Sequence, residues 1–316
     1  MTAKTELMAR RKPGAAFVRA IKGNWELYLL FSPVVIWYII FHYVPMGGII
    51  IAFKDFKVLR GIMASPWVGL SNFTRFISSS AFRSTLTNTI AISLMNLAFA
   101  FPAPIIFALL LNEVRYMLPK RFIQTVSYLP HFISWTVAGG LFYMLLSPST
   151  GIVNGIIRAF GMPAVNFMGE SRYIRWILVI SSIWKGLGWG AIVYLAAIAG
   201  VDEELYEAAT IDGAGRFRRV WNITIPSIMN VVVIMLILQV GNILNVNFEQ
   251  VFIMVNDTTL SMGETIEYYI YRVGLFSTNN YSLGAAVGLF KSVIGFSLII
   301  LTNMLSKKIT DGGGIW

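Results

Sequence analysis

The chain alternates between long apolar stretches and shorter polar ones. A helix that crosses a bilayer needs about 20 mostly apolar residues, and windows of this kind occur six times. The predicted spans lie near residues 27–53, 88–111, 122–146, 176–200, 227–248 and 283–305. The pattern therefore predicts an all-α, polytopic membrane protein with six transmembrane helices and both termini on the same side of the membrane.

The distribution of basic residues predicts which side that is. Lysine and arginine are about twice as dense in the segments on the N-terminal side of the membrane as in the opposite loops, and cytoplasmic loops retain such residues. We therefore expect a cytoplasmic tail at residues 1–26, a transmembrane domain at 27–305 and a second cytoplasmic tail at 306–316. Membrane lipid is then the main surroundings of the chain.

The composition supports the membrane assignment and excludes several other classes. Of the 316 residues, 56% are hydrophobic and only 13% are charged, and the mean hydropathy is +0.69. The formal charge of +10 follows from topology, so no nucleic-acid partner is predicted. Without cysteine the chain has no disulfide framework or thiolate metal site, and only two histidines, His42 and His131, remain for other metal sites.

The most charged segment is the loop at residues 201–226, between the fourth and fifth predicted spans. Its first half reads as a helix with an acidic first turn, which suits the positive end of a helix dipole, and Gly213 is a natural stop. Its second half, Arg216–Asn222, predicts another short helix before Pro226 begins the next span. Small Ala208 and Ala209 lie beside bulky neighbours, which is typical of a projecting knob that docks into a partner.

This loop resembles a long and specific motif. It reads Glu207-Ala208-Ala209, then Asp212-Gly213-Ala214, then Ile223-x-Ile225-Pro226, which is similar to the EAA motif of permease subunits of ATP-binding-cassette (ABC) importers. Val220 and Ile225 differ from the usual residues but remain apolar. The resemblance implies a type I ABC importer permease fold and a coupling contact with an ATPase. The resemblance assigns this coupling role to Leu205, Tyr206, Glu207, Ala208, Ala209, Asp212 and Gly213.

Further segments resemble the poly- and oligosaccharide branch of these permeases, the lipoprotein-type sugar permeases. They are Ser65–Phe73, Tyr128–Trp135, Ile183–Gly190, Gly288–Gly295 and the ending Gly314-Ile315-Trp316. The resemblance implies an oligosaccharide or polysaccharide importer in the bacterial inner membrane. Its implied partners are an ABC ATPase dimer, a second similar permease chain and an extracytoplasmic solute-binding protein.

The chain itself is not expected to be an enzyme. It has no Gly-x-x-x-x-Gly-Lys-Ser/Thr phosphate loop, so ATP and Mg²⁺ are expected on the partner ATPase, and no cofactor is expected on this chain. No metal-ligand spacing and no Ser/His/Asp arrangement is present. The sequence therefore predicts a transport subunit that is driven by another chain.

Polar residues inside the spans are candidates for the substrate pathway, because charges there are costly. Lys185 in the fourth span is equally consistent with donating to sugar hydroxyls and with a packing role, in which it snorkels or pairs with a carboxylate such as Glu249. For Lys291 in the sixth span the packing role is favoured. Trp184 and Trp189 are candidates for stacking on sugar rings, with interfacial anchoring as the alternative.

The fifth span carries a run of amides and one carboxylate. Amides suit a neutral polyol because each offers both donors and acceptors, although hydrogen bonding between helices is an alternative. On a continuous helix Gln239, Asn242 and Gln250 share a face, as do Asn245 and Glu249. The pathway candidates in this run are Gln239, Asn242, Asn245, Asn247, Glu249 and Gln250.

Two other functions stay open at this point. One is an ABC permease for a different polar solute. The other is an ion-coupled secondary transporter, which would predict paired titratable residues at mid-membrane and an inverted repeat. Neither feature is clear in the sequence.

Overall fold

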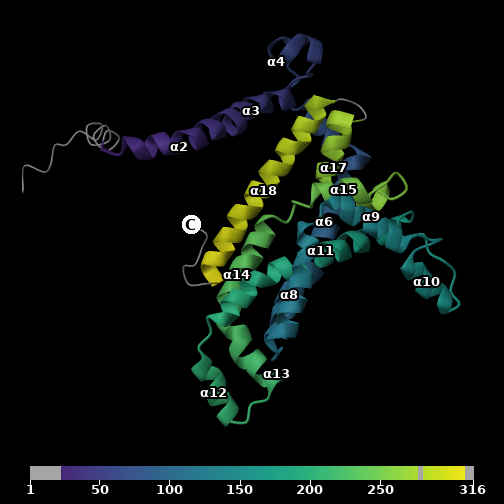
Figure 1. Cartoon of the computed structure of the whole chain (residues 1–316). Coiled ribbons are helices and arrows are strands. Elements are labelled where there is room, and N and C mark those ends of the chain that lie inside the picture. Colours follow the sequence, from purple (N-terminus) through teal and green to yellow (C-terminus); the bar gives the residue numbers. More distant parts are fainter. Residues whose placement is uncertain (1–22, 277–279, 310–316) are drawn as a thin grey trace, which may run out of the picture.

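The computed structural model describes residues 23–276 and 280–309, which form helices joined by loops (Figure 1). Most of the two predicted tails, residues 1–22 and 310–316, lies outside the described residues. Within the described part, five helices are long and apolar enough to cross a membrane, and one bent pair makes a sixth candidate. These candidates are Trp25–Phe53, Ser80–Asn112, the pair Met117–Phe132 and Trp135–Leu146, Ser171–Ala199, Arg216–Gly241 and Tyr281–Met304.

Local changes of helix type interrupt the first two spans. The first consists of α2 (Trp25–Tyr38), the π-helical η2 (Ile39–Tyr43), α3 (Val44–Met46) and the 3₁₀ segment η3 (Gly47–Phe53). The second consists of α6 (Ser80–Met95), the π-helical η5 (Asn96–Ala100) and α7 (Pro102–Asn112). The π-helical turn directly before Pro102 is a common way to accommodate a residue without an N–H. The loop between the two spans contains η4 (Val58–Arg60), α4 (Gly61–Ala64) and α5 (Ser71–Ile77).

The remaining helices complete the bundle. The bent pair is α8 (Met117–Phe132) and α9 (Trp135–Leu146), followed by α10 (Ile152–Ala159) and α11 (Ser171–Ala199). Next come α12 (Glu203–Ile211), α13 (Arg216–Arg219), η6 (Val220–Thr224) and α14 (Ile225–Gly241). The chain ends with α15 (Phe248–Met254), α16 (Leu260–Gly263), α17 (Ile266–Tyr271), η7 (Arg272–Phe276) and α18 (Tyr281–Ile309).

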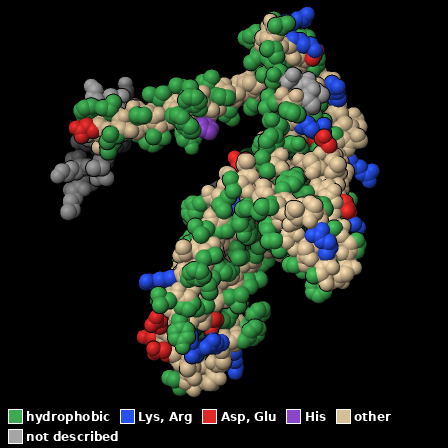
Figure 2. All heavy atoms as spheres, turned by 45° about the vertical axis from the view of Figure 1, so that its right-hand side comes forward, with side chains coloured by type: hydrophobic (Ala, Val, Ile, Leu, Met, Phe, Trp, Pro, Cys, Tyr) green, Lys and Arg blue, Asp and Glu red, His purple; other side chains and the backbone are tan. Residues whose placement is uncertain are grey.

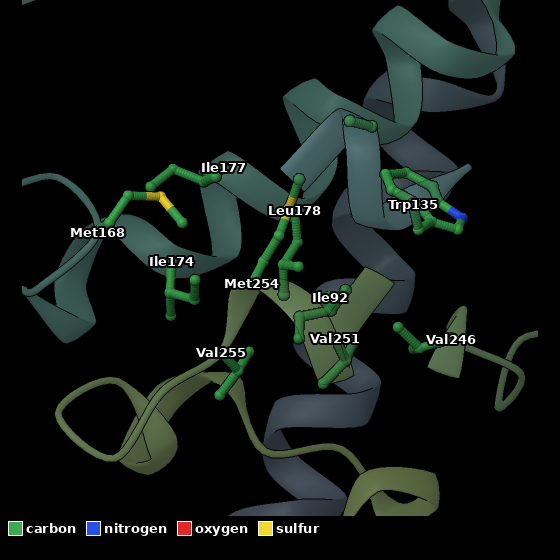
Figure 3. Close-up of a cluster of buried hydrophobic side chains, with 11 residues drawn as sticks. Ile92, Trp135, Met168, Ile174, Ile177, Leu178, Val246, Val251, Met254 and Val255 are labelled. Atoms are coloured by element: carbon green, nitrogen blue, oxygen red, sulfur yellow. The ribbon is translucent and has the colours of Figure 1, made fainter. Parts of the chain in front are cut away.

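The main core lies where α11 meets the helices on either side of it. Ile174 and Leu178 of α11 are fully buried, and they pack with Ile92 of α6, Trp135 of α9 and Met254 of α15 (Figure 3). Burial of this kind contributes about 1.5–3 kcal/mol for each large apolar side chain in water; inside a bilayer the gain comes from close packing instead. Because α11 contributes to this core and to a second one with α7 and α14, it is the central helix of the bundle.

Buried polar side chains satisfy backbone groups of the irregular segment around α16. The amide of Asn88 donates to the carbonyls of Ser261 and Glu264 at 3.2 and 3.1 Å. Arg175 of α11 in turn donates to Asn88 Oδ1 at 2.7 Å. Non-helical backbone at membrane depth requires such internal partners, because lipid offers none. These bonds therefore connect α6, α11 and α16.

The first span stands apart from the bundle in Figure 1. Its outer end, η3, packs against α18 and buries Ala52, whereas α2 has no buried residue. Apolar side chains such as Leu30, which is 77% exposed, cover α2 all round. The α2 part of this span therefore makes almost no contact with the rest of the described chain.

Two predicted spans differ from the structure. The third is not one straight helix, since α8 and α9 meet at an angle of 106°. Pro130 removes a backbone donor near the end of α8, and the Ser134 hydroxyl caps the start of α9 by accepting from Val137 N at 3.3 Å. The fifth predicted span extends too far, since α14 ends at Gly241 and the chain is irregular until α15 begins.

The amides themselves explain the end of the fifth span. Asn242 donates to the carbonyl of Leu238 at 3.0 Å, Asn245 donates to Asn242 Oδ1 at 3.0 Å, and Asn247 caps α15. Such local bonds compete with helix formation. The prediction that Gln239, Asn242 and Gln250 share one helix face is therefore wrong, because no single helix contains them.

Candidate functional site

The structure contains two groups of candidate functional residues, at different levels of the bundle. The first is the knob, which we define as α12 and the turn after it, residues 202–215. The second is the amide cleft, which lies between α7, α11 and the irregular segment after α14. Figure 2 shows acidic and basic side chains gathered over α12 and α13 at one end of the molecule, with hydrophobic side chains over the spans.

The knob is a rigidly built helix. The Asp202 carboxylate caps its N-terminus by accepting from Glu204 N at 3.0 Å. At its other end Gly213 adopts the left-handed conformation, with φ of 75°. Gly213 N then donates to the carbonyl of Thr210 at 3.1 Å, and Ala214 N donates to that of Ala209 at 2.8 Å. This pair of bonds is a Schellman motif, which ends the helix at a defined residue.

Two side-chain bonds fasten the knob to the next helix. The hydroxyls of Tyr206 and Thr224 lie 2.9 Å apart, and Arg219 donates to Thr210 Oγ1 at 2.8 Å. The predicted separate helix at Arg216–Asn222 is wrong, because α13, η6 and α14 run on as one helix from Arg216 to Gly241. The π-helical η6 precedes Pro226 and accommodates its missing N–H without a break.

The predicted coupling residues divide into two sets. Tyr206 and Ala209 are half-buried against the chain itself, and Tyr206 is an internal anchor. The exposed members are Leu205, Glu207, Ala208, Asp212 and Gly213. Sequence reasoning missed Ile211, which is 87% exposed at the tip, and Phe217, which is 80% exposed and stacks on Trp221. Their signal in the sequence was an apolar side chain within a charged loop.

The amide cleft is a cavity of about 280 Å³. Its polar lining comes from three parts of the chain, and its members are Asn96, Ser182, Gln239, Asn245, Asn247 and Gln250. Asn242 lines a smaller adjoining cavity together with Asn96, Gln239 and Asn245. The structure thus brings together five of the amides predicted from the sequence, although they do not share a helix.

The amides of the cleft are not equally free. Gln250 is 1% exposed, and its amide nitrogen donates to the carbonyl of Leu178 at 2.6 Å and to Ser181 Oγ at 2.8 Å. Gln239, Asn245 and Asn247 are exposed in the isolated chain. Gln250 therefore holds α15 against α11, while the exposed amides keep donors and acceptors available to a ligand.

Asn96 and Ser182 belong to the cleft but were not predicted. The Oδ1 atom of Asn96 is buried and has no hydrogen-bond partner within the described residues. Ser182 donates to Gln250 Oε1 at 3.2 Å. The available signal for Asn96 in the sequence was an amide near the middle of a mostly apolar span.

The other pathway candidates lie outside the cleft lining. Glu249 is exposed in the first turn of α15, where a carboxylate complements the helix dipole. Trp184 packs edge-on against Phe142 at 5.8 Å beside the main core. Trp189 stacks on His131, with ring centroids 4.4 Å apart.

The two lysines within spans both have partners in this chain. Lys185 donates to backbone carbonyls at the end of α8 and makes no ion pair with Glu249. Lys291 pairs with Glu267 and so joins α18 to α17. This ion pair agrees with the packing role favoured for Lys291, with Glu267 and not Glu249 as the carboxylate. Neither ammonium lines the amide cleft.

A partly buried ion pair stabilises the end of the bundle opposite the knob. Arg272 donates to Glu264 Oε1 at 2.6 Å, and the Glu264 side chain is 8% exposed. The hydrogen bond to Glu264 raises the pKa of Arg272 above its usual value. Asn72, which also lies at this end, is buried and donates to the carbonyls of Ala52 and Lys54.

Comparison with known proteins identifies the family. Residues 100–311 match the model of the binding-protein-dependent transport system inner membrane component. The chain is 44% identical over 307 residues to the polygalacturonan/rhamnogalacturonan transport system permease protein YteP of Bacillus subtilis, covering 97% of this chain and 95% of that protein. It is 43% identical over 300 residues to protein LplB of the same organism, covering 95% and 94%.

Solved structures agree with this result. A chain of a bacterial ABC transporter involved in the import of the acidic polysaccharide alginate superposes with a TM-score of 0.86 at 37% identity, covering 93% of this chain and 99% of that one. The same values of TM-score and identity are found for the alginate transporter in complex with a periplasmic protein bound to an alginate pentasaccharide. The all-helical polytopic fold is therefore that of an ABC importer permease. The chain belongs to the family of binding-protein-dependent transport system inner membrane components, as a multi-pass transport subunit rather than a catalytic one.

Proposed function

We propose that this chain is one of two permease subunits that together import oligosaccharides or polysaccharides by alternating access, driven by a separate ATPase. The observation that carries the proposal is the amide cleft. Exposed amides at the end of α14 and in the segment after it offer hydrogen-bond donors and acceptors, and Asn96 lines the same cleft. Hydroxyl-rich substrates need this mixture, and no group in the cleft lining is charged.

The substrates of the relatives narrow the choice of sugar. YteP is described as a polygalacturonan/rhamnogalacturonan permease, and the superposing structure as an alginate importer. Fragments of these acidic polysaccharides are therefore the first candidates. Because the described cleft lining contains no cation, we infer that recognition of their carboxylates falls to the second permease or to the binding protein.

A second permease subunit is supported by the exposed surfaces of this chain. The α2 helix has no buried residue and needs apolar neighbours other than its own bundle. The cleft of about 280 Å³ is also at the lower limit of ligand pockets, which usually measure about 300–1,000 Å³. Another six-span chain would cover the apolar surface of α2 and would add the rest of the substrate pathway. We propose a distinct but similar chain rather than a second copy of this one.

The coupling contact is assigned to the knob. Leu205, Glu207 and Ala208 are exposed on a helix whose two ends are fixed, so a partner that moves this helix also moves α14. ATP and Mg²⁺ would bind on the ATPase dimer, and an extracytoplasmic binding protein would deliver sugar to the opposite face. With the knob on the cytoplasmic side, both termini are cytoplasmic.

Purification of the tagged chain from its native membrane tests the proposal. We expect an ATPase and a second six-span permease to co-purify with it. We also expect this complex to hydrolyse ATP faster when sugar-loaded binding protein is added. An active protein purified alone would overturn the proposal and favour an ion-coupled transporter.

A charge reversal tests the coupling surface. Glu207→Arg should remove the ATPase from the purified complex while leaving membrane insertion intact. The control is Asp257→Arg, the same reversal at an exposed position on the other face, which should retain the ATPase. Retention of the ATPase by both variants would exclude Glu207 from the docking contact.

A further inference from the structure

The bend of the third span leaves backbone groups that need partners. The last carbonyls of a helix have no intrahelical donor, and α8 ends at Phe132 where the chain turns by 106° into α9. Pro130, near this end, contributes no N–H of its own. Within the membrane these carbonyls have no water to bond, so another part of the protein must supply donors.

Lys185 of α11 supplies them. Its ammonium donates to the carbonyl of Pro130 at 3.1 Å, to that of His131 at 2.8 Å, and to that of Ile133. A lysine has three N–H donors, and these three bonds use all of them. The cation also lies at the negative end of the α8 dipole and 5.5 Å from the ring centre of Trp135, which is the first residue of α9.

Two further contacts near the end of α8 hold it against α11. Gly188 lies so close to Ser127 that an added Cβ would be 2.3 Å from its carbonyl oxygen. One residue further, Trp189 stacks on His131 with an interplanar angle of 3°. Positions 185, 188 and 189 share one face of α11, because residues three and four apart on a helix are neighbours.

We propose that Lys185 is a positioning residue that locks the bend of the third span to α11, so that α8, the start of α9 and α11 move as one rigid body during transport. The ammonium acts through the backbone carbonyls of residues 130–133 and not on the sugar, which explains why it lies outside the amide cleft. The consequence for transport depends on the proposed function; the rigid-body arrangement does not.

Because this chain has no cysteine, two introduced cysteines are the only labelling sites that it contributes to the complex. The labelling sites are Met144 of α9 and Val193 of α11, which are both exposed. Met144 lies about 15 Å along α9 from Ser134, at 1.5 Å per residue, so the label reports the angle of α9. The distance between the labels is measured in the complex purified from its native membrane, both without nucleotide and trapped with ATP.

The proposal predicts one narrow distance distribution that is the same in both states. Lys185→Met should broaden or shift it, and Lys185→Arg, which retains a cation with several donors, should restore it. Sugar-stimulated ATP hydrolysis by the Lys185→Met complex should lose kcat, while KM for ATP stays unchanged, because the substitution leaves the ATPase subunits themselves intact.

Several results would overturn the proposal. A distance that changes between the two states in the wild-type complex would show that the helices do not move together. An unchanged distribution in Lys185→Met would show that the lysine does not hold the bend. If that variant is not recovered, the two-state comparison in the wild type still decides. A wild-type complex without sugar-stimulated ATPase would contradict the proposed function alone, because the distance measurement does not depend on it.

Discussion

The close approach of Gly188 to Ser127, between α11 and α8, provides a test of the packing. A Cβ added at Gly188 would lie 2.3 Å from the carbonyl oxygen of Ser127 and 2.5 Å from its carbonyl carbon. Both atoms belong to the backbone of α8, so no side chain can rotate away to make room. Gly188→Ala should therefore force the two helices apart and destabilise the protein.

The expected magnitude follows from two opposing contributions. Overpacking a well-packed contact costs about 1–3 kcal/mol, whereas replacing glycine by alanine inside a helix gains up to about 1 kcal/mol. Gly186 provides the matched control, because it lies on the same helix and a Cβ there meets no atom within 4 Å. The difference between Gly188→Ala and Gly186→Ala isolates the steric cost, which we expect to be about 1–3 kcal/mol.

The assay is unfolding of the purified chain in detergent micelles, followed by far-UV circular dichroism during titration with a denaturing detergent. Gly186→Ala should unfold at or slightly above the wild-type midpoint, and Gly188→Ala clearly below it. Equal midpoints for the two variants would refute the close contact between α8 and α11. The same result would remove one of the three contacts that hold the bent third span against α11.

Two further pairs of substitutions test the end of the knob and the roles of two cleft amides. Gly213→Ala should speed amide hydrogen exchange in Glu203–Ile211 about tenfold, because the left-handed conformation costs alanine about 1–2 kcal/mol; Gly215→Ala, at φ of −65°, should not, and equal exchange would contradict the Schellman turn. Gln250→Leu should lower the free energy of unfolding by about 1–3 kcal/mol through loss of buried hydrogen bonds. Gln239→Leu should leave stability within about 0.5 kcal/mol and raise KM for sugar import, and the reverse pattern would exclude the assigned roles.

The family resemblance and the fold class followed from the sequence because they depend on local pattern. Apolar stretches of bilayer length predict spans wherever they occur, and the EAA-like loop is a contiguous motif. The comparisons confirm the family, and the structure agrees with an all-helical membrane protein. The sequence also contained local signals for the two spans that were predicted incorrectly. These signals are Pro130 with Ser134 in the third span and the run of asparagines after Gly241 at the end of the fifth. Hydropathy does not respond to these signals, since it averages over a window and ignores helix caps.

The type of the cleft amides could be read from the sequence, but their placement and hydrogen-bond partners could not. Residue type identified Gln239, Asn242, Asn245, Asn247 and Gln250 as polar groups in an apolar setting, but a helix that ends at Gly241 places them by loop geometry and not by helical period. Whether an amide bonds to its own chain or remains free depends on which carbonyls lie opposite. Only the packing of α15 on α11 decided that Gln250 is a structural residue.

For the charge of Lys185, too, the sequence showed that a partner was needed but not which group it would be. The sequence determined that a lysine within a span needs a partner, because an unpaired charge there is costly. It did not determine the partner, for which Glu249 was one candidate. Tertiary structure decided it, since the bend between α8 and α9 exposes carbonyls 52–55 residues away in the chain at the height of the ammonium. The sequence alone thus determined which side chains need hydrogen-bond partners. The packing of helices that are distant in the sequence decided which groups become those partners, because hydrogen bonds act only over about 3 Å.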